Sequence, residues 1–161
     1  MDEVADRLAD LEQRVTALEA AATAHAEAVV ADGSAGVVRY GGDVHLHGDV
    51  SWEITLDAGT AVALDDEPRV AVLAALGHPA RGRIVRTLLT RGPCGTSALQ
   101  EAAGLASTGQ LYHHLRSLTH SGVVEQDGRG SYRVGTRAVV PVLVLLTAAA
   151  DVAGQLRDQP S

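Results

Sequence analysis

The spacing of apolar residues changes along the chain, and each change predicts a different kind of element. In residues 3–22, spacings of four and three alternate as in a coiled coil, at Val4, Leu8, Leu11, Val15, Leu18 and Ala22. Residues 32–36 break this helix. From Val37 to Leu64 apolar and polar residues alternate, which predicts a small β-hairpin or meander.

The charges of residues 3–22 favour a parallel dimer. Arg7 and Arg14 fall at g positions of the heptad, and Glu12 and Glu19 fall at e positions. In a parallel pair each g position meets the following e position of the partner, so opposite charges face each other, whereas an antiparallel pair would bring like charges together. The alternative is an amphipathic helix that packs on its own domain. A coil of this length is marginal by itself, so we expect it to assist a dimer that is also held elsewhere.

Helical spacing returns after a polar link at residues 64–69. Gly77 ends the first of these predicted helices, and Pro79 begins the next at a position where proline is tolerated. Gly104 ends a short helix anchored by Leu99. Four helices are predicted in this region. One begins at Pro79 and ends before the segment 91–95, and the others cover residues 68–76, 96–103 and 107–122.

Residues 107–122 predict a capped helix with two unlike sides. Ser107 and Gln110 have the spacing of a capping box, and Gly122 ends the helix. One side is an apolar stripe and the other is polar. The stripe consists of Leu111, Leu115 and Leu118.

The C-terminal part predicts a hairpin followed by a long helix. Two short strands flank the turn at residues 127–130, with Arg129 at its tip. Residues 136–156 read as an apolar helix with Pro141 in its first turn. This helix is too apolar all round for the surface of a monomer, so we expect it to be buried against a second copy.

The order of helix, short helix, tight turn, capped helix and hairpin is that of a winged helix-turn-helix. The expected fold class is therefore mainly α with small β, or α+β. The expected parts are an N-terminal coiled-coil helix (1–31), a β-hairpin segment with a linker (32–66), a winged helix-turn-helix DNA-binding domain (67–135), and a C-terminal dimerisation helix with a tail (136–161). Dimer contacts are expected at Leu8, Leu11, Val15, Leu18, Val142, Leu145 and Leu146.

Composition adds an aliphatic core and an uneven charge. The chain has 161 residues, no Phe, one Trp and a net charge of −7. Residues 1–66 hold 3 Arg and 14 acidic residues, whereas residues 67–161 hold 10 Arg and 6 acidic residues, so the C-terminal part suits a nucleic-acid partner. The start lacks the pattern of a signal peptide, and the longest apolar run is too short to span a membrane. These features predict a soluble protein of the cytoplasm, associated with the nucleoid and not with a membrane.

Enzymatic functions find no support in the motifs. The chain has no G-x-S-x-G elbow, no Walker loop and no H-E-x-x-H motif. The sequence therefore predicts neither an enzyme nor a bound cofactor.

Residues 68–134 resemble the arsenical-repressor (ArsR) family of bacterial transcription regulators, in a form similar to an actinobacterial branch with an N-terminal extension. The motifs are "LAALGHPARGRIVRTLL", "SALQEAAGLASTGQLYHHLRSLTHSGVVE" and "QDGRGSYRV". The resemblance implies a homodimeric repressor that binds an inverted-repeat operator in double-stranded DNA. It implies that Arg129 reaches DNA from the wing and that His114 packs inward. The residues that it places against DNA are Thr108, Gln110, Tyr112, His113 and Arg116.

Other interpretations of these residues stay open. Arg129 could be a solvated turn residue, and the adjacent His113 and His114 could bind a metal, although neighbours on a helix point about 100° apart. The charged residues Arg81, Arg83, Arg86 and Arg91 could contact phosphates or serve solubility alone. The alternative function is a protein-interaction adaptor, which does not use its winged helix for DNA and recruits a partner through the coil.

The chain departs from the family at its sensor position. Many members sense metals through paired cysteines, but this chain has Cys94 alone, and one thiolate cannot build a tetrahedral site. His45 and His47 share one face of a predicted strand with Asp43 and Asp49, which could hold a metal. We expect a small-molecule or protein effector of unknown identity to act through residues 37–64, which contain Trp52, or through the dimer interface.

The coil can be tested by reversing its charges. Arg7→Glu combined with Arg14→Glu should weaken self-association, measured by analytical ultracentrifugation, because like charges would then face each other in a parallel pair. Cross-linking through position 1 should be efficient in the unmodified chain. Efficient cross-linking of position 1 to position 22 instead would reveal an antiparallel pair.

Overall fold

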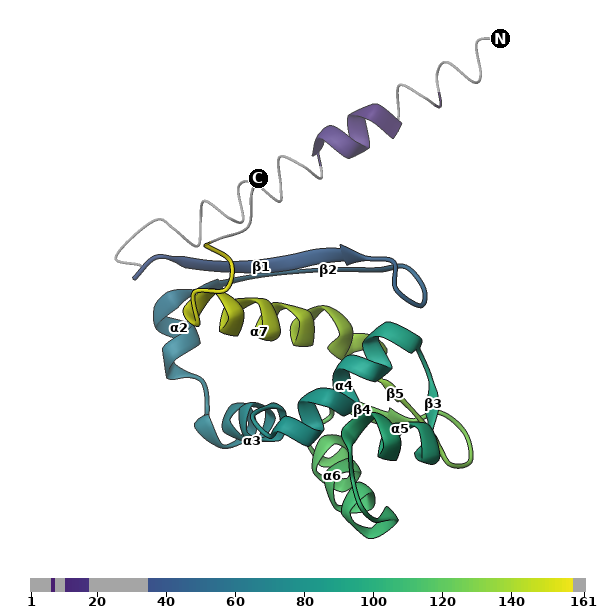
Figure 1. Cartoon of the computed structure of the whole chain (residues 1–161). Coiled ribbons are helices and arrows are strands. Elements are labelled where there is room, and N and C mark those ends of the chain that lie inside the picture. The colour runs from purple at the N-terminus through teal and green to yellow at the C-terminus, as the bar shows by residue number, and fades with distance from the viewer. Residues whose placement is uncertain (1–6, 8–10, 18–34, 158–161) are drawn as a thin grey trace. The chain divides into compact units, whose positions relative to one another are not determined.

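The computed structural model describes Arg7, residues 11–17 and residues 35–157 (Figure 1). Residues 11–17 are helical, and the side chains of Leu11 and Val15 are 53% and 52% exposed. Leu8 and Leu18 lie outside the described residues. The coiled coil therefore stays a prediction.

The described residues group into two compact units. Those up to Arg39 group with residues 54–64, and residues 40–53 group with residues 65–157. The strands of one hairpin run through both units. The second unit contains the residues of the predicted winged helix-turn-helix.

The predicted hairpin is confirmed, with two corrections. β1 (Val37–Val44) pairs with β2 (Val50–Asp57) in a two-stranded sheet. Residues 45–49 are the connecting loop, so the prediction of a strand face through His45 and His47 is wrong. The alternation also does not continue to Leu64, because residues after Asp57 form α2 (Ala58–Ala63).

The cause of α2 is local. The Asp57 carboxylate accepts a hydrogen bond from the Thr60 backbone N–H at 2.9 Å, which caps the helix. The alanines that follow favour a helix over a strand.

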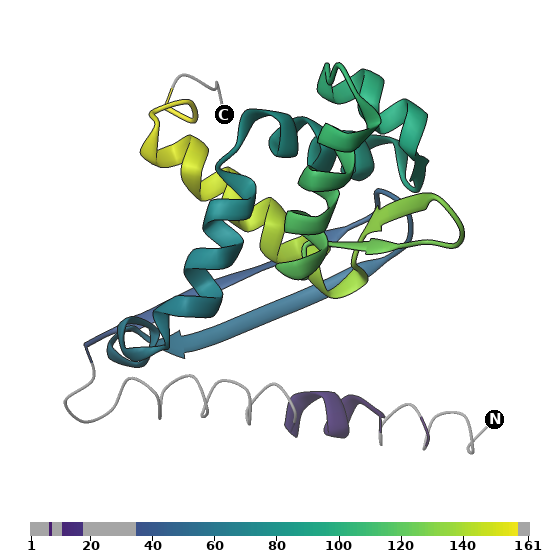
Figure 2. The same cartoon turned by 90° about the horizontal axis from the view of Figure 1, so that it is seen from below.

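The second unit has the element order of a winged helix-turn-helix (Figures 1 and 2), which confirms the predicted fold class. β5 lies between β3 and β4 in a three-stranded antiparallel sheet, with Cys94 opposite Tyr132 and Val124 opposite Val134. The elements are α3 (Asp66–Leu76), α4 (Pro79–Arg91), β3 (Cys94–Gly95), α5 (Thr96–Ala103), α6 (Thr108–His120), β4 (Val124–Gln126), β5 (Ser131–Val134), the 3-10 helix η1 (Thr136–Ala138) and α7 (Val139–Val152).

Several helix boundaries differ from those predicted, among them the start of α7, which lies at Val139, after the 3-10 helix η1, and not at residue 136. α3 begins at Asp66, inside the expected polar link, because Asp65 caps it by accepting from the Glu67 N–H at 3.2 Å. α7 ends at Val152 and not at residue 156. Gly154 follows with φ +77°, a backbone conformation that closes a helix.

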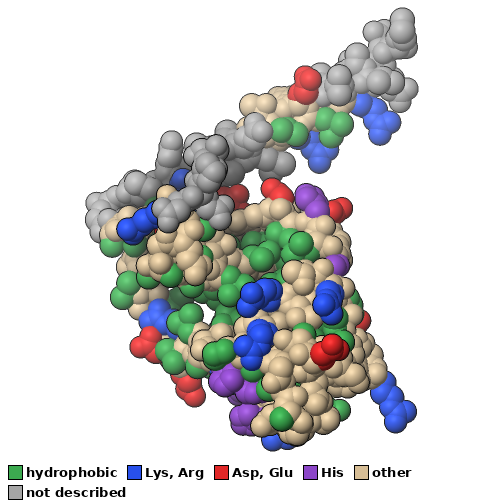
Figure 3. Space-filling view, viewed as in Figure 1, with side chains coloured by type: hydrophobic (Ala, Val, Ile, Leu, Met, Phe, Trp, Pro, Cys, Tyr) green, Lys and Arg blue, Asp and Glu red, His purple; other side chains and the backbone are tan. Residues whose placement is uncertain are grey.

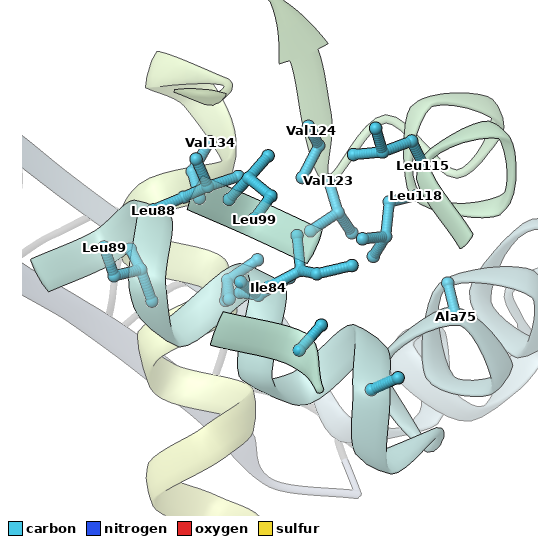
Figure 4. Close-up of a cluster of buried hydrophobic side chains, with 14 of the residues drawn as sticks. Ala75, Ile84, Leu88, Leu89, Leu99, Leu115, Leu118, Val123, Val124 and Val134 are labelled. Atoms are coloured by element: carbon cyan, nitrogen blue, oxygen red, sulfur yellow. The ribbon is translucent and has the colours of Figure 1, made fainter. Parts of the chain in front are cut away.

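The core of the second unit is aliphatic and centres on α4 (Figure 4). Ile84 and Leu99 are fully buried, and Leu88 is 2% exposed. α4 contacts α3, α5, α6 and β5, so one helix joins the elements of the helix-turn-helix to the wing.

α7 contributes to this core and also reaches the surface. Val142 is 2% exposed and packs within the core of its own chain, so the expectation that it faces a second copy needs correction. Leu145 is half-buried, and Leu146 is 39% exposed. One side of α7 is thus buried within the chain itself, which explains part of its apolar character.

Two glycines of the second unit should respond oppositely to alanine. Gly92 is buried at φ +78°, and a Cβ there would lie 3.1 Å from Nδ1 of His47. Gly92→Ala should lower the free energy of unfolding by about 1–3 kcal/mol. Gly82 lies within α4, and no atom from outside its own helix backbone lies within 4 Å of the position that an added Cβ would take. Gly82→Ala should therefore raise the free energy of unfolding by about 0.5–1 kcal/mol. Urea denaturation of both variants measures the difference, and equal effects would contradict it.

Candidate nucleic-acid interface

α6 separates its side chains into a buried and an exposed side, as its sequence predicts. Leu111 and Leu118 are fully buried, and Leu115 is 1% exposed. His114 is 9% exposed, which confirms its inward position. The five residues expected to face DNA on this helix are all exposed, namely Thr108, Gln110, Tyr112, His113 and Arg116.

Hydrogen bonds at the turn fix where α6 begins. The Ser107 hydroxyl accepts from the Gln110 N–H at 3.3 Å, and the Gln110 side-chain oxygen accepts from the Ala106 N–H at 3.2 Å. This arrangement is a capping box in which the Gln110 side chain binds the backbone N–H of the residue before Ser107 and not that of Ser107 itself. At the other end Gly122 adopts φ +74°, as expected of the residue that ends the helix.

Gln100 braces the turn from α5, a role that the sequence pattern did not reveal. Its side-chain nitrogen donates to the Leu105 carbonyl at 3.3 Å, and its side-chain oxygen accepts from the Thr108 hydroxyl at 3.1 Å. Because the first bond holds the turn and the second crosses from α5 to α6, together they set the position of one helix on the other.

The exposed residues of α6 therefore differ in what they can offer to a ligand. The Thr108 hydroxyl and the Gln110 side-chain oxygen already make hydrogen bonds at the turn. Within residues 35–157, the side chains of Tyr112, His113 and Arg116 make no hydrogen bond or ion pair, although the His113 ring lies 5.7 Å from that of His114. These three residues keep their donors and acceptors available.

A groove of about 800 Å³ lies between α6 and the wing. Tyr112, His113 and Arg116 line it from the helix, and Glu125, Gln126 and Tyr132 line it from the hairpin of β4 and β5. The groove is thus bordered by the side chains of α6 that remain unpaired.

An ion-pair cluster joins side chains of the two strands of the wing. Arg133 lies opposite Glu125 across the two strands, and its Nε and Nη2 each lie 2.7 Å from Glu125 Oε1. Asp127 Oδ1 lies 3.7 Å from Arg133 Nε. Arg129 is exposed in the turn between the strands, so it is placed as the sequence predicts, at the tip.

The arginines of α4 divide into two kinds. Arg81 donates to the Ala75 and Ala74 carbonyls at 2.5 and 2.7 Å, at the end of α3. Arg83 donates to the Ala103 carbonyl at 3.1 and 2.8 Å, at the end of α5. Both stabilise helix C-termini, where a positive charge is favourable. Arg86 and Arg91 are exposed.

His114 sits in a cluster of basic groups on the inner side of α6. Its ring centroid lies 4.6 Å from that of His78, whose Nδ1 accepts the Ala80 N–H at the start of α4. Burial lowers the pKa of His114, and His78, Arg81 and His113 lower it further by repelling a positive charge. Nδ1 of His114 is buried without a hydrogen-bond partner in the described structure. Figure 3 shows histidine and arginine side chains on this part of the molecule.

The residues considered for metal binding are arranged differently from the prediction. His45 Nδ1 pairs with Asp49 Oδ1 at 2.7 Å, whereas His47 Nε2 lies 3.1 Å from the Leu89 carbonyl oxygen. The Cys94 thiol donates to the Gly92 carbonyl. Within the part of the chain that the structure describes, no three His, Cys, Asp or Glu residues form a group that could hold a metal ion. None of the described helices is long and apolar enough to cross a membrane.

Comparison with known proteins finds a family match to part of the second unit. Residues 76–127 match the model of a helix-turn-helix domain family, over less than half of the chain. No curated protein matches the chain. The match covers α4, α5, α6 and β4.

Solved structures similar to this chain include several bacterial regulators. A possible transcriptional regulatory protein from Mycobacterium bovis (fragment 1–100) is 26% identical, with 53% of this chain and 92% of that chain covered and a TM-score of 0.46. A homodimeric winged helix-turn-helix DNA-binding domain from the same organism, a possible ArsR-family regulator, is 22% identical, with 66% and 97% covered and a TM-score of 0.49. The transcriptional repressor BigR from Xylella fastidiosa is 28% identical, with 50% and 84% covered and a TM-score of 0.40.

The buried His114 should make stability depend on pH. Because its pKa is lowered in the folded state, the unfolded chain binds the proton more readily, and stability falls as pH drops through and below the ordinary histidine pKa of ~6.5. When the pH is lowered from about 7.5 to about 5.5, we expect the free energy of unfolding to fall less in His114→Leu than in the unmodified chain. Thermal unfolding at both pH values measures this, with the exposed His120→Gln as the control. Equal pH dependence in all three chains would exclude His114 as the cause.

Proposed function

We propose that this protein is a sequence-specific DNA-binding transcription regulator, and that it acts as a homodimeric repressor on an inverted-repeat operator. The observation that carries the proposal is the set of unpaired side chains Tyr112, His113 and Arg116 on the exposed side of α6, beside the groove that the wing borders. The helix-turn-helix match over residues 76–127 supports it.

The chemistry of these side chains suits a major groove. An α-helix fits the width of that groove, where each base pair presents its own pattern of donors and acceptors. Arg116 can donate two hydrogen bonds to the edge of a guanine, and the His113 ring can donate or accept. Thr108 and Gln110, whose polar groups serve the turn, would position the helix more than read bases.

The remaining exposed arginines suit phosphates. Arg129 extends from the wing tip, and Arg86 and Arg91 are exposed on α4. Arg81 and Arg83 are excluded from this role in the described conformation because they bind helix-end carbonyls. Phosphate contacts fix the position of a protein on DNA, while base contacts supply specificity.

A homodimer would bring two copies of α6 to successive turns of the duplex, with half-sites about one helical turn apart. Exposed apolar side chains are available for such an interface. Val70 and Leu73 are both 53% exposed and lie three residues apart on α3, and Leu146 is 39% exposed on α7. The N-terminal coil would add to this interface.

The alternative function is a protein-interaction adaptor, which the acidic residues 1–66 favour. The two functions differ in their salt dependence. Binding of duplex DNA by the full chain should weaken steeply with salt, because arginines that contact phosphates release counterions. An adaptor would show no such binding.

Substitutions on α6 test the proposal directly. Arg116→Ala should weaken binding to an operator selected from random duplexes, because it removes a contact to base edges. His113→Ala should relax base preference, at a cost on the order of 1–3 kcal/mol for the preferred sequence. Fluorescence anisotropy at fixed salt measures both affinities.

Arg157→Ala is the matched control for charge, since Arg157 is exposed and follows α7, whose C-terminal end lies far from α6 (Figure 1). It should leave the affinity nearly unchanged. If the Arg116→Ala, His113→Ala double variant binds as tightly as the unmodified chain, α6 is not the reading element.

A further inference from the structure

A second cavity lies within the same unit, away from the groove beside α6. Its volume is about 200 Å³, and residues of the hairpin loop, the end of α4, β5 and the start of α7 line it. Most of the lining is apolar and includes Val44, Leu46, Leu88, Leu89, Val134 and Val139. An engineered apolar cavity of about 150 Å³ binds benzene, so this cavity has room for a six-membered ring with one small substituent.

The hairpin loop closes one side of the cavity through a fitted contact. The His47 ring lies against Gly92, where an added Cβ would come within 3.1–3.4 Å of three ring atoms. Its Nε2 lies 3.1 Å from the Leu89 carbonyl oxygen near the C-terminus of α4. The loop is therefore docked on α4, and Leu46, 47% exposed, borders the opening.

The polar groups of the lining can bind an anion. Arg133 and Thr136 both line the cavity. Arg133 uses Nε and Nη2 toward Glu125, and its Nη1 makes no hydrogen bond to any described residue. The acidic residue of the lining, Asp49, is paired with His45. A carboxylate in the cavity would thus meet a guanidinium with a donor to spare.

Arg133 also joins the cavity to the groove beside α6. Its partner Glu125 lines that groove, whereas Arg133 itself lines the cavity. A carboxylate that binds Arg133 from the cavity in bidentate fashion, on Nη1 and Nη2, competes with Glu125 for Nη2. Glu125 would then carry an unpaired negative charge at the surface proposed to face DNA.

From this arrangement we infer that the cavity binds a small apolar carboxylic acid in its ionised form. We infer also that binding of this acid lowers the affinity of the protein for DNA. The apolar part occupies the aliphatic lining, and the carboxylate binds Arg133 and Thr136. Loss of the Arg133–Glu125 pair leaves the backbone pairing of β4 with β5 in place and adds negative charge beside α6. The regulatory part of this inference rests on the proposed function, and the ligand site does not.

Calorimetry with the full chain and no DNA tests the site. Benzoate is the first probe, and benzamide, which has the same shape without the charge, is its control. We expect saturable binding of benzoate that exceeds that of benzamide by about tenfold or more, because a charge-assisted hydrogen bond is worth roughly twice a neutral one. Arg133→Gln should remove this preference, and Arg137→Gln, a neighbouring exposed arginine outside the lining, should retain it.

A second variant guards against loss of the fold. Leu46→Trp places a large side chain at the opening, at a position that is half exposed, and should reduce benzoate binding while the circular dichroism spectrum stays that of the unmodified chain. Absence of saturable benzoate binding, or binding that neither Arg133→Gln nor Leu46→Trp reduces, overturns the site.

DNA binding with and without benzoate tests the coupling. Saturating benzoate should weaken DNA affinity about fivefold or more, within the usual range for coupled sites, and Glu125→Gln should reduce this effect while benzoate still binds. If benzoate binds as expected and DNA is not bound under any condition, the site stands and the proposed function fails. If both bind without influencing each other, the coupling through Arg133 is wrong.

Discussion

Burial of one side of α6 is the constraint on which the rest of this structure depends. Leu111, Leu115 and Leu118 are at most 1% exposed, and each fully buried leucine contributes about 1.5–3 kcal/mol. A rotation of α6 about its axis by one residue, about 100°, would move this stripe out of the core. The outward direction of His113 and Arg116 is therefore set by the leucines on the other side. The site needs no contacts of its own to stay oriented, which leaves its polar groups available to a ligand.

Polar side chains then fix what the apolar core leaves undetermined, namely how the short helices meet at their ends. The core is aliphatic and contains no Phe, and the packing of aliphatic side chains alone constrains the geometry of the turns only weakly. Gln100 links α5 to the turn through one hydrogen bond and to α6 through another, and Arg83 binds the last carbonyl of α5 from α4. Arg81 binds the Ala75 and Ala74 carbonyls in the last turn of α3. The basic charge of α4 thus serves the fold at two positions and remains exposed at Arg86 and Arg91.

These two levels explain what could be predicted from the sequence. Local signals predicted the helix ends at Gly77, Gly104 and Gly122, and the leucine spacing predicted which side of α6 is buried, because both depend on residues a few positions apart. The start of α3 and the whole of α2 were missed, since an aspartate cap outweighed the pattern that surrounds it. The bonds of Arg81 and Arg83 span 7 and 20 residues, and no spacing rule reports them. The same holds for the loop at residues 45–49, whose docking on α4 depends on tertiary contact.

The two kinds of interaction also differ in how easily a small molecule can change them. A buried leucine leaves its site only at a cost of several kcal/mol, so α6 keeps its orientation under any ligand of modest affinity. The pair of Arg133 and Glu125 is nearly half exposed on both sides, and pairs of that kind contribute about 0–1 kcal/mol. Exchange of Glu125 for another carboxylate is therefore nearly neutral in energy, yet it changes the charge that borders the groove. The wing keeps its backbone pairing and its buried valines, and the exposed Arg133–Glu125 pair on it is the contact through which we propose that a small ligand acts.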